Sequence, residues 1–427
     1  MSVVTVDGPR RFTGRLRVPG DKSISHRALM LAALGNRPCT VRGLSDGEDV
    51  ADTRRAVEAL GARVEEGSGG DAATVTITGG LTGADAPIYL GNSGTGIRLL
   101  AGLVAGFDFT TTLDGDDSIR SRPMDRIIAP LSAMGASVQG QGAGGTRAPL
   151  TIRGGGLRGI EYTLPVASAQ VKGAVLLAGL RAEGPTTVRE SVATRAHTEE
   201  MLAAAGVRVQ REGHSVTVWP GEVTPPDVEV PGDPSQAAFW LVGACLAPNS
   251  DLTVENVYLG QARGGFVKVL ARMGADITAD RSSGDVRART GELAATRVTA
   301  EELPGCIDEV PILAVAAAAA HGVTVFEGIA ELRVKETDRV AAITGLLDSL
   351  GVRGRVHGNA LEVDGAGSAE KFRPGTVACR GDHRMAMAAA IAGAAGGGSV
   401  TIEGFDATRT SYPGFAADLS RVTGWAP

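Results

Sequence analysis

A repeated pattern divides the chain into six similar segments. In each copy a glycine follows the end of a helix-like stretch and precedes a strand-like one. Successive glycines are 74, 71, 68, 77 and 73 residues apart, and the sixth copy is degenerate. The glycines and a second signal, a set of small-residue-rich apolar stretches, agree on six copies, which indicates a repeat architecture. The glycines are Gly61, Gly135, Gly206, Gly274, Gly351 and Gly424, and small-residue-rich apolar stretches begin near Ser23, Ser93, Ser168, Ser235, Glu309 and His383.

One repeat reads as a buried helix, a strand, an amphipathic helix and a second strand. Residues 386–395 are almost entirely Ala, Met, Ile and Gly, so a helix there is apolar all round and must be buried. Residues 49–60 alternate charged and apolar positions, which suits a half-exposed helix, and Gly61 is placed for a left-handed C-terminal cap. Three such units can pack their buried helices together, so six units make two groups of three.

Composition limits the class of protein. A length of 427 residues favours about two to three domains. The net charge of −6 does not favour nucleic-acid binding, and no apolar run is long enough to span a membrane. Four scattered cysteines, without metal-binding spacing, are typical of free thiols in a reducing compartment. We therefore expect a soluble cytoplasmic protein with no metal site, no nucleic-acid partner and no membrane partner.

Basic residues lie at unfavourable positions at the starts of predicted helices. Lys22 and Arg27 flank the start of the first buried helix, and Arg384 lies at the start of the sixth. A cation at a helix N-terminus is disfavoured by a few tenths to about 1 kcal/mol, because that end carries partial positive charge. A bound anion would reverse the sign of this interaction, so these positions are candidates for phosphate or carboxylate binding.

A second cationic pair, Lys335 and Arg339, is four residues apart. On one helical face such a like-charge pair is unfavourable by about 0.2–0.5 kcal/mol, and an anionic ligand between them would relieve it. The alternative is local neutralisation by Glu336 and Asp338. Spacing alone leaves both interpretations open.

Acidic residues also precede the apolar helices. Asp233 is followed by a proline, as in a helix N-cap, and Asp308 and Asp382 are placed for the same role. Asp308 has a second interpretation, because Glu309 and a very apolar helix follow it. A carboxylate held at the mouth of a buried element can act as a general base.

Eight segments together resemble the family of 5-enolpyruvylshikimate-3-phosphate synthases, also called 3-phosphoshikimate 1-carboxyvinyltransferases, and are closer to its second class. They occur in the family order, and the run around Lys335 is the most specific of them. The segments are 21–27 (DKSISHR), 91–98 (GNSGTGIR), 121–124 (SRPM), 167–172 (ASAQVK), 232–235 (GDPS), 307–309 (IDE), 332–339 (LRVKETDR) and 382–387 (DHRMAM).

The resemblance implies a fold as well as an activity. The family fold is of the α+β (α/β) class, with two domains that each contain three copies of a βαβαββ unit around buried central helices. This enolpyruvyl transferase fold is also described as an inside-out α/β barrel. The resemblance further implies that one domain is discontinuous and comprises residues 1–18 and 231–427, while residues 19–230 form the other.

The family transfers the enolpyruvyl group of phosphoenolpyruvate to the 5-hydroxyl of shikimate 3-phosphate and releases phosphate, on the way to chorismate and the aromatic amino acids. The resemblance implies no metal and no cofactor. It implies that Glu336 protonates the methylene carbon, that Asp308 is the base near the hydroxyl, and that Lys22 assists proton transfer. The implied shikimate 3-phosphate ligands are Lys22, Ser23, Arg27, Ser168, Ala169, Gln170, Arg195, Asp308 and Lys335. The implied phosphoenolpyruvate ligands are Lys22, Gly94, Arg122, Gln170, Arg339 and Arg384.

Two positions bear on how close the resemblance is. Many first-class members carry a lysine before a Thr-Phe-Pro sequence near the C-terminus, whereas here Thr410 precedes Ser-Tyr-Pro and the nearest cation is Arg409, which we leave out of the site. Position 94 is Gly, as in herbicide-sensitive members, so we expect inhibition by glyphosate.

Two alternatives to this reading are a UDP-N-acetylglucosamine enolpyruvyl transferase and a non-catalytic repeat scaffold. Many of the former carry a reactive cysteine in a loop that corresponds to residues 114–122, where this chain has none. A scaffold would spread its charges over one face, whereas here the polar motifs gather at helix starts. We expect an enzyme that acts as a monomer.

Overall fold

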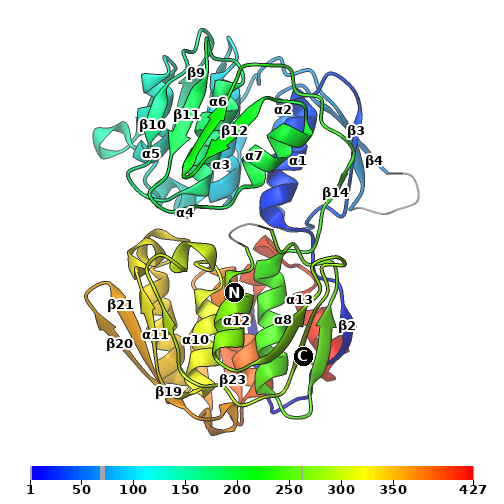
Figure 1. Cartoon of the computed structure of the whole chain (residues 1–427), viewed down its shortest axis with the longest axis vertical. Helices are drawn as coiled ribbons and strands as arrows, with labels where there is room; N and C mark the ends of the chain where they lie inside the picture. Colours follow the sequence, from blue (N-terminus) through cyan, green and yellow to red (C-terminus); the bar gives the residue numbers. More distant parts are fainter. Residues whose placement is uncertain (1, 68–72, 261–262, 427) are drawn as a thin grey trace. The chain divides into compact units, whose positions relative to one another are not determined.

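The computed structural model describes residues 2–67, 73–260 and 263–426. The chain divides into two compact units (Figure 1). The continuous unit comprises Gly20–Val230, and the discontinuous unit comprises Met1–Pro19 together with Pro231–Pro427.

Each unit is built around three apolar helices. In the discontinuous unit, α8, α10 and α12 pack against one another, and in the continuous unit α3 packs against both α1 and α6 (Figure 1). All thirteen residues of α12 are buried, as its composition of Ala, Met, Ile and Gly requires. The six helices are α1 (Lys22–Leu34), α3 (Gly94–Ala105), α6 (Ala169–Gly179), α8 (Pro234–Leu246), α10 (Val310–Ala319) and α12 (His383–Ala395).

The second helix of each repeat ends at the repeated glycine. All six of these glycines have φ between +69° and +110°, which confirms the predicted left-handed caps. After α2 the Ala62 N–H donates to the Val57 carbonyl at 3.0 Å, and the next four helices end with the same bond at 2.9–3.0 Å. The six helices are α2 (Glu48–Ala59), α5 (Asp125–Ala133), α7 (His197–Ala204), α9 (Gly265–Arg272), α11 (Arg339–Ser349) and α13 (Phe415–Thr423).

The three sheets of the continuous unit interlock. Each four-stranded sheet takes one edge strand from the preceding repeat, and the last strand of the third repeat, β14, pairs in parallel with β3 of the first. The three repeats therefore close on themselves. The strand orders are β14 (Val228–Glu229), β3 (Cys39–Arg42), β5 (Val75–Thr78), β4 (Arg63–Glu66); β6 (Ile88–Tyr89), β7 (Thr110–Asp114), β9 (Arg147–Arg153), β8 (Ser137–Gln141); and β10 (Glu161–Thr163), β11 (Thr186–Arg189), β13 (Ser215–Val218), β12 (Val209–Glu212).

The discontinuous unit closes in a similar way, through the N-terminal segment. Strand β2 pairs in parallel with β15, and β1 pairs antiparallel with β23, so the first residues of the chain complete two sheets formed by the C-terminal half. The strand orders are β16 (Asp276–Ala279), β17 (Val286–Arg289), β15 (Asp251–Val254), β2 (Thr13–Leu16); β18 (Arg297–Val298), β19 (His321–Glu327), β21 (Ala360–Ala366), β20 (Arg353–His357); and β1 (Val3–Val6), β23 (Val400–Glu403), β22 (Gly375–Ala378).

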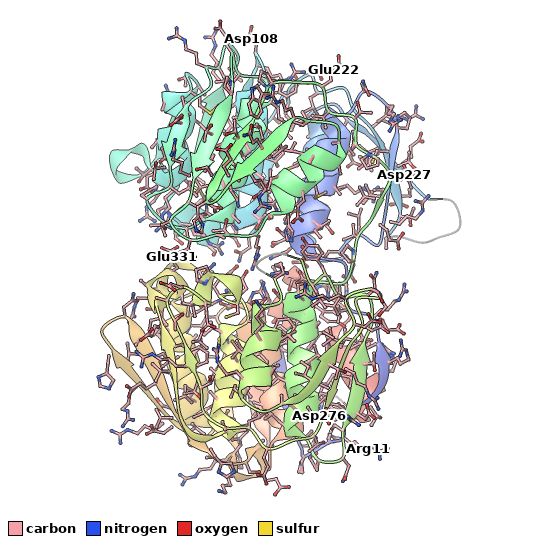
Figure 2. The ribbon with its side chains drawn as sticks, viewed as in Figure 1. Arg11, Asp108, Glu222, Asp227, Asp276 and Glu331 are labelled. Atoms are coloured by element: carbon pink, nitrogen blue, oxygen red, sulfur yellow. The ribbon has the colours of Figure 1, made fainter. Side chains whose placement is uncertain are left out.

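The outer faces of the sheets carry the charged side chains. Asp276 of β16, labelled in Figure 2, lies opposite Arg289 of β17 in the strand register, and the two side chains form an exposed ion pair at 2.9 Å. Such cross-strand pairs contribute little to stability but keep the outer face polar. The inner faces pack on the apolar helices, so the mixed α/β fold class with three repeats per unit is confirmed. Within the described residues, no helix is both long and apolar enough to cross a membrane.

Candidate active site

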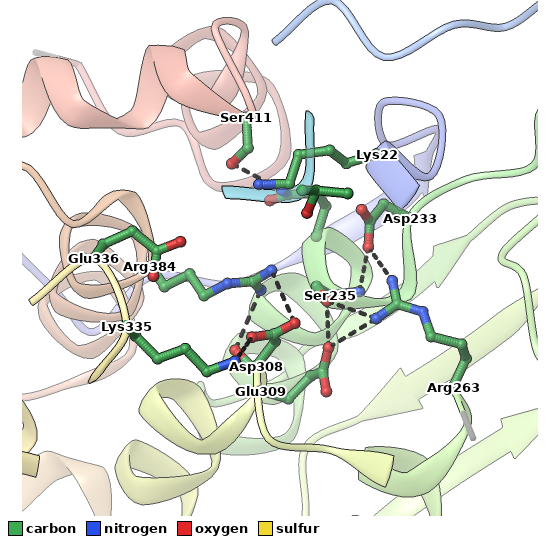
Figure 3. Close-up of polar contacts among 12 residues, drawn as sticks. Lys22, Asp233, Ser235, Arg263, Asp308, Glu309, Lys335, Glu336, Arg384 and Ser411 are labelled. Carbon is green, nitrogen blue, oxygen red and sulfur yellow. Dashed lines mark hydrogen bonds and ion pairs between the residues drawn. The ribbon is translucent and has the colours of Figure 1, made fainter. Parts of the chain in front are cut away.

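In the discontinuous unit, one carboxylate is surrounded by three cations. Asp308 lies 3.5 Å from the Lys335 ammonium, 3.4 Å from Arg339 Nη1 and 3.7 Å from Arg384 Nη2. Arg384 also donates from Nη1 to the Asp308 carbonyl at 3.2 Å. Figure 3 shows Lys335 and Arg384 converging on Asp308 from different segments of the chain. The three predicted cations of this unit are therefore connected to one another through Asp308.

Arg339 is the buried anchor of this cluster. Its side chain is 1% exposed and is paired with Asp382 at 2.8 Å, with Glu336 at 2.5 Å and with Asp308. Burial lowers the pKa of Arg339, but the carboxylates of Asp382, Glu336 and Asp308 outweigh that effect and raise the pKa above its ordinary value. Arg339 is therefore a permanent positive charge held by three carboxylates.

The structure corrects one assumption about Lys335 and Arg339. They do not share a helical face, because a 3₁₀ segment, η3 (Ile329–Val334), ends before Lys335 and α11 begins only at Arg339. Asp338 is the N-cap of α11 and accepts from the Val340 and Ala341 N–H groups, so the chain turns between the two cations. The two residues converge because both contact Asp308, and Glu336 takes the neutralising role towards Arg339 that local pairing predicts.

The three acidic residues at helix starts have different roles. Asp233 and Asp382 are N-caps, as predicted, and accept from the N–H groups of Ser235 and Arg384. Asp308 is not a cap, because the N-cap position of α10 is Glu309 and no side chain bonds there. The Asp308 carboxylate faces cations instead, so of the two interpretations of this residue, N-cap and general base, only the general base remains.

The continuous unit holds a second group of polar residues at the starts of α3 and α6. Arg98 donates to the Gly94 carbonyl at 3.1 Å and to the Gln170 amide oxygen at 2.9 Å, and Gln170 donates to Thr95 at 2.9 Å. Arg122 is 7% exposed and donates to Asn92 at 2.8 Å. Gly94 and Arg122 of the second repeat are thus brought together with Gln170 of the third.

A third group lies at the start of α1. The Lys22 ammonium donates to Asp49 of α2 at 2.8 Å. Arg27 donates from Nη1 to the Ser23 hydroxyl at 2.7 Å and from Nε to the Thr198 hydroxyl of α7 at 2.7 Å. Lys22 and Ser23 are therefore held within the first repeat, and Arg27 is held by the third repeat of the same unit.

The remaining predicted residues lie beside these groups. Ser168 is the N-cap of α6 and accepts from the Val171 N–H, and Ala169 is the first residue of that helix. Arg195 is half-buried in the segment between β11 and α7. Sequence reasoning gave no role to Asp49, Arg98 or Thr198, which hold predicted site residues in place. Arg98 lies within a matched segment, and Thr198 lies in residues 194–198 (TRAHT), which also resemble the second class of the family.

The cysteines contribute no reactive thiol to the described part of the chain. All four are buried. Burial raises the pKa of Cys39 to about 11 and those of Cys245 and Cys379 to about 12, and it also raises the pKa of Cys306. A thiol with a raised pKa is protonated near neutrality and is a weak nucleophile. Among the residues that the structure describes, no cluster of His, Cys, Asp and Glu has a metal-binding arrangement.

Solved structures share this fold over nearly the whole chain. The EPSP synthase of Acinetobacter baumannii superposes with a TM-score of 0.86 at 38% identity, covering 99% of this chain and 98% of its own. The enolpyruvyl transferase NikO of Streptomyces tendae superposes with a TM-score of 0.79 at 19% identity, covering 98% of this chain and 97% of its own. The fold, with its cations gathered at helix starts, is that of the enolpyruvyl transferases.

Sequence comparison identifies the family within that class. The profile of the family EPSP synthase (3-phosphoshikimate 1-carboxyvinyltransferase) matches residues 6–419. A 3-phosphoshikimate 1-carboxyvinyltransferase of Bacillus cereus is 43% identical, covering 96% of this chain and 97% of its own length. The Caulobacter vibrioides protein of the same name is 46% identical, covering 96% and 95%. The chain belongs to the EPSP synthase family.

Proposed function

We propose that this chain transfers the enolpyruvyl group of phosphoenolpyruvate to the 5-hydroxyl of shikimate 3-phosphate and releases phosphate, as the reaction of its family requires. The observation that carries the proposal is the set of three cations around Asp308, because both substrates are polyanions. Planar guanidinium groups such as those of Arg339 and Arg384 suit carboxylate and phosphate, since they can donate two parallel hydrogen bonds.

The substrate contacts are part of this proposal. Phosphoenolpyruvate is held by Lys22, Gly94, Arg122, Gln170, Arg339 and Arg384. Shikimate 3-phosphate is held by Lys22, Ser23, Arg27, Ser168, Ala169, Gln170, Arg195, Asp308 and Lys335. The proposal is supported by the grouping of these residues within each unit, since most of them lie at or near the starts of the buried helices α1, α3, α6, α10 and α12. Helix N-termini favour anions through their partial positive charge.

Proton transfer is assigned to two carboxylates with different surroundings. Asp308 faces three cations, which favour its carboxylate form, the form that can accept the proton of the substrate hydroxyl. Glu336 is 16% exposed and protonates the methylene carbon of phosphoenolpyruvate. Because the product is again an enol ether, the methyl group must lose a proton as phosphate departs, and that proton returns to the Glu336 carboxylate. The ion pair between Glu336 and Arg339 favours an ionised Glu336, so the incoming substrate anions must compete for Arg339 before Glu336 can act as an acid.

A UDP-N-acetylglucosamine enolpyruvyl transferase is not favoured. The curated relatives given above carry the name 3-phosphoshikimate 1-carboxyvinyltransferase, and residues 114–122 contain no cysteine. The four cysteines of the chain are buried in the repeats and do not offer a reactive thiol in its place.

The test is release of inorganic phosphate from phosphoenolpyruvate by the purified full chain. We expect release only when shikimate 3-phosphate is present, and none when UDP-N-acetylglucosamine replaces it. Release that depends on UDP-N-acetylglucosamine would assign the chain to the other reaction. No release with either acceptor, from a folded protein, would refute the proposed activity.

We also propose that the chain acts as a monomer in the cytoplasm. The four buried, unpaired cysteines suit a reducing compartment. Light scattering behind size-exclusion chromatography should give a mass near 43.5 kDa. A mass of twice that value at micromolar concentration would contradict the monomer.

A further inference from the structure

A fully buried lysine lies in α6, one turn beyond the proposed substrate contacts Ser168, Ala169 and Gln170. The ammonium of Lys172 donates to Glu190 Oε2 at 2.9 Å and to Glu199 Oε1 at 2.8 Å, and its side chain is 0% exposed. Both carboxylates are buried as well. None of these three residues has a part in the chemistry or in the substrate contacts proposed above.

A contribution to stability does not by itself explain the buried cluster of Lys172, Glu190 and Glu199. Transferring ions from water to the interior carries a desolvation penalty that can exceed their attraction, and buried ion pairs can often be replaced by apolar residues without loss of stability. Here one lysine faces two carboxylates, and Glu199 Oε2 has no hydrogen-bond partner among the described residues. An arrangement of this kind calls for a role in fixing geometry.

The two carboxylates bracket a single segment of the chain. Glu190 directly follows β11, and Glu199 lies in the first turn of α7. The segment between them, residues 191–196, carries Arg195, and its Thr194 hydroxyl donates to the other oxygen of Glu190. Lys172 therefore fastens both ends of the Arg195 segment to α6.

The contacts around Lys172 also link α6, through α7, to the start of α1. Thr198, next to Glu199, accepts from Arg27 Nε at 2.7 Å, and Arg27 also donates to Ser23. Gly173, next to Lys172, lies so close to α7 that an added Cβ would stand 2.8 Å from the Thr198 hydroxyl and 3.3 Å from Arg27 Nη2. The start of α6, the Arg195 segment and Arg27 thus meet around Lys172 and its neighbour.

We propose that Lys172 is a positioning residue for shikimate 3-phosphate, which it does not touch. By binding Glu190 and Glu199 it fixes the Arg195 segment and the first turn of α7 against α6, and through Thr198 it orients Arg27. The proposal rests on the proposed function, because it names the ligand of that same site. The competing explanation is that Lys172 only neutralises two buried carboxylates.

The two explanations predict different results for a triple variant that removes all three charges, Lys172→Met with Glu190→Gln and Glu199→Gln. This variant leaves no unpaired buried charge, so it should fold with a thermal midpoint close to that of the wild type. If Lys172 positions the segment, the dissociation constant of shikimate 3-phosphate, measured by calorimetry without phosphoenolpyruvate, should rise at least tenfold. The KM for phosphoenolpyruvate and kcat at saturating substrates should stay within threefold.

The single variant Lys172→Arg keeps the cation and should recover part of the affinity for shikimate 3-phosphate. As a matched control, Lys268→Met removes an exposed lysine of α9 and should leave every constant unchanged. A triple variant that binds shikimate 3-phosphate within twofold of the wild type would overturn the positioning role, and so would an equal loss of affinity for both substrates. A wild-type chain that binds no shikimate 3-phosphate would instead refute the proposed function.

Discussion

Arg339 donates from Nε to the Asp382 carboxylate at 2.8 Å, and the two side chains are 1% and 0% exposed. Asp382 also caps α12 through the Arg384 N–H, so one carboxylate fixes two of the proposed phosphoenolpyruvate ligands. Arg339 begins α11 and Arg384 lies in the first turn of α12. The pair therefore sets the spacing between two helix starts from different repeats of the discontinuous unit.

Asp382→Asn should destabilise the protein strongly. Asparagine keeps an oxygen that can cap α12 but removes the charge that faces Arg339. Removing one partner of a buried ion pair costs about 3–5 kcal/mol, and we expect the lower end because Glu336 and Asp308 still face Arg339. Urea unfolding measures the change. As a control, Glu302→Gln breaks the half-exposed pair with Arg272 and should cost less than about 1 kcal/mol. Equal losses for the two variants would contradict a special role for the buried pair.

Glu336→Gln should abolish turnover while sparing substrate binding. Glutamine matches the shape of the side chain but cannot donate a carboxylic acid proton to the methylene carbon. We expect kcat to fall by at least about 10² to 10⁴-fold, the usual contribution of general acid catalysis, with KM changed little. The measurement is phosphate release together with calorimetric binding of shikimate 3-phosphate. A variant that keeps more than a tenth of the wild-type kcat would refute the role of Glu336 as the acid.

The parts of this molecule that depend on local sequence could be predicted. A glycine that terminates a helix readily adopts positive φ because it has no Cβ, and the six repeated glycines, which all do so, located six helix ends. The apolar composition of residues 386–395 likewise required burial. These two signals gave the number of repeats and the number of central helices.

Contacts between distant segments could not be predicted from spacing. Lys172 is bound by residues 18 and 27 positions away, on a loop and on another helix, and no periodic pattern joins them. Lys335 and Arg339 are four apart, yet they converge through Asp308 rather than along a helix. The sequence therefore located the cations of the candidate site, with Glu336 as a local partner and Asp308 as a candidate base, whereas the convergence of the cations on Asp308 and the pairing of Arg339 with Asp382 emerged only from the fold.

His26 should make the stability of the fold depend on pH. It is fully buried with its Nδ1 at 2.7 Å from the Thr53 hydroxyl, and burial, followed by the charges of Lys22 and Arg27, holds its pKa well below the ordinary value of 6.5. Between this lowered pKa and pH 6.5, His26 binds a proton in the unfolded chain but not in the folded chain. The free energy of unfolding therefore falls as the pH falls through 6.5. The slope from this group approaches about 1.4 kcal/mol per pH unit.

The measurement for His26 is urea unfolding at intervals between pH 7.5 and 5.5, above the range in which most carboxylates titrate. His26→Gln offers an amide in place of the imidazole and removes its titration. The plot of unfolding free energy against pH should be less steep for the variant than for the wild type, by an amount that corresponds to at most one bound proton. This difference in slope does not depend on the absolute stability of the variant. Identical slopes for the variant and the wild type would show that His26 takes up its proton equally well in both states.

Gly94→Ala should weaken phosphoenolpyruvate binding without unfolding the chain. A Cβ at this position would stand 2.5 Å from Arg122 Nη1 and 2.9 Å from Arg98 Nη1, so both guanidinium groups must move. Movement is possible because these are the ends of long side chains, and the backbone of Gly94 does not need a left-handed conformation. We therefore expect the KM for phosphoenolpyruvate to rise about tenfold, about 1.4 kcal/mol, with little change in thermal midpoint.

Glyphosate inhibition provides a second measurement on Gly94→Ala. If glyphosate binds beside Arg122, the glyphosate concentration that gives half inhibition of the Gly94→Ala variant should rise by a larger factor than its KM for phosphoenolpyruvate. The matched control is Gly345→Ala on the exposed face of α11, where an added Cβ meets no atom within 4 Å. That variant should leave KM and inhibition unchanged, because alanine suits an exposed helix interior better than glycine. A wild-type enzyme unresponsive to millimolar glyphosate, or a Gly94→Ala enzyme with unaltered KM, would show that Gly94 does not set the space beside Arg122.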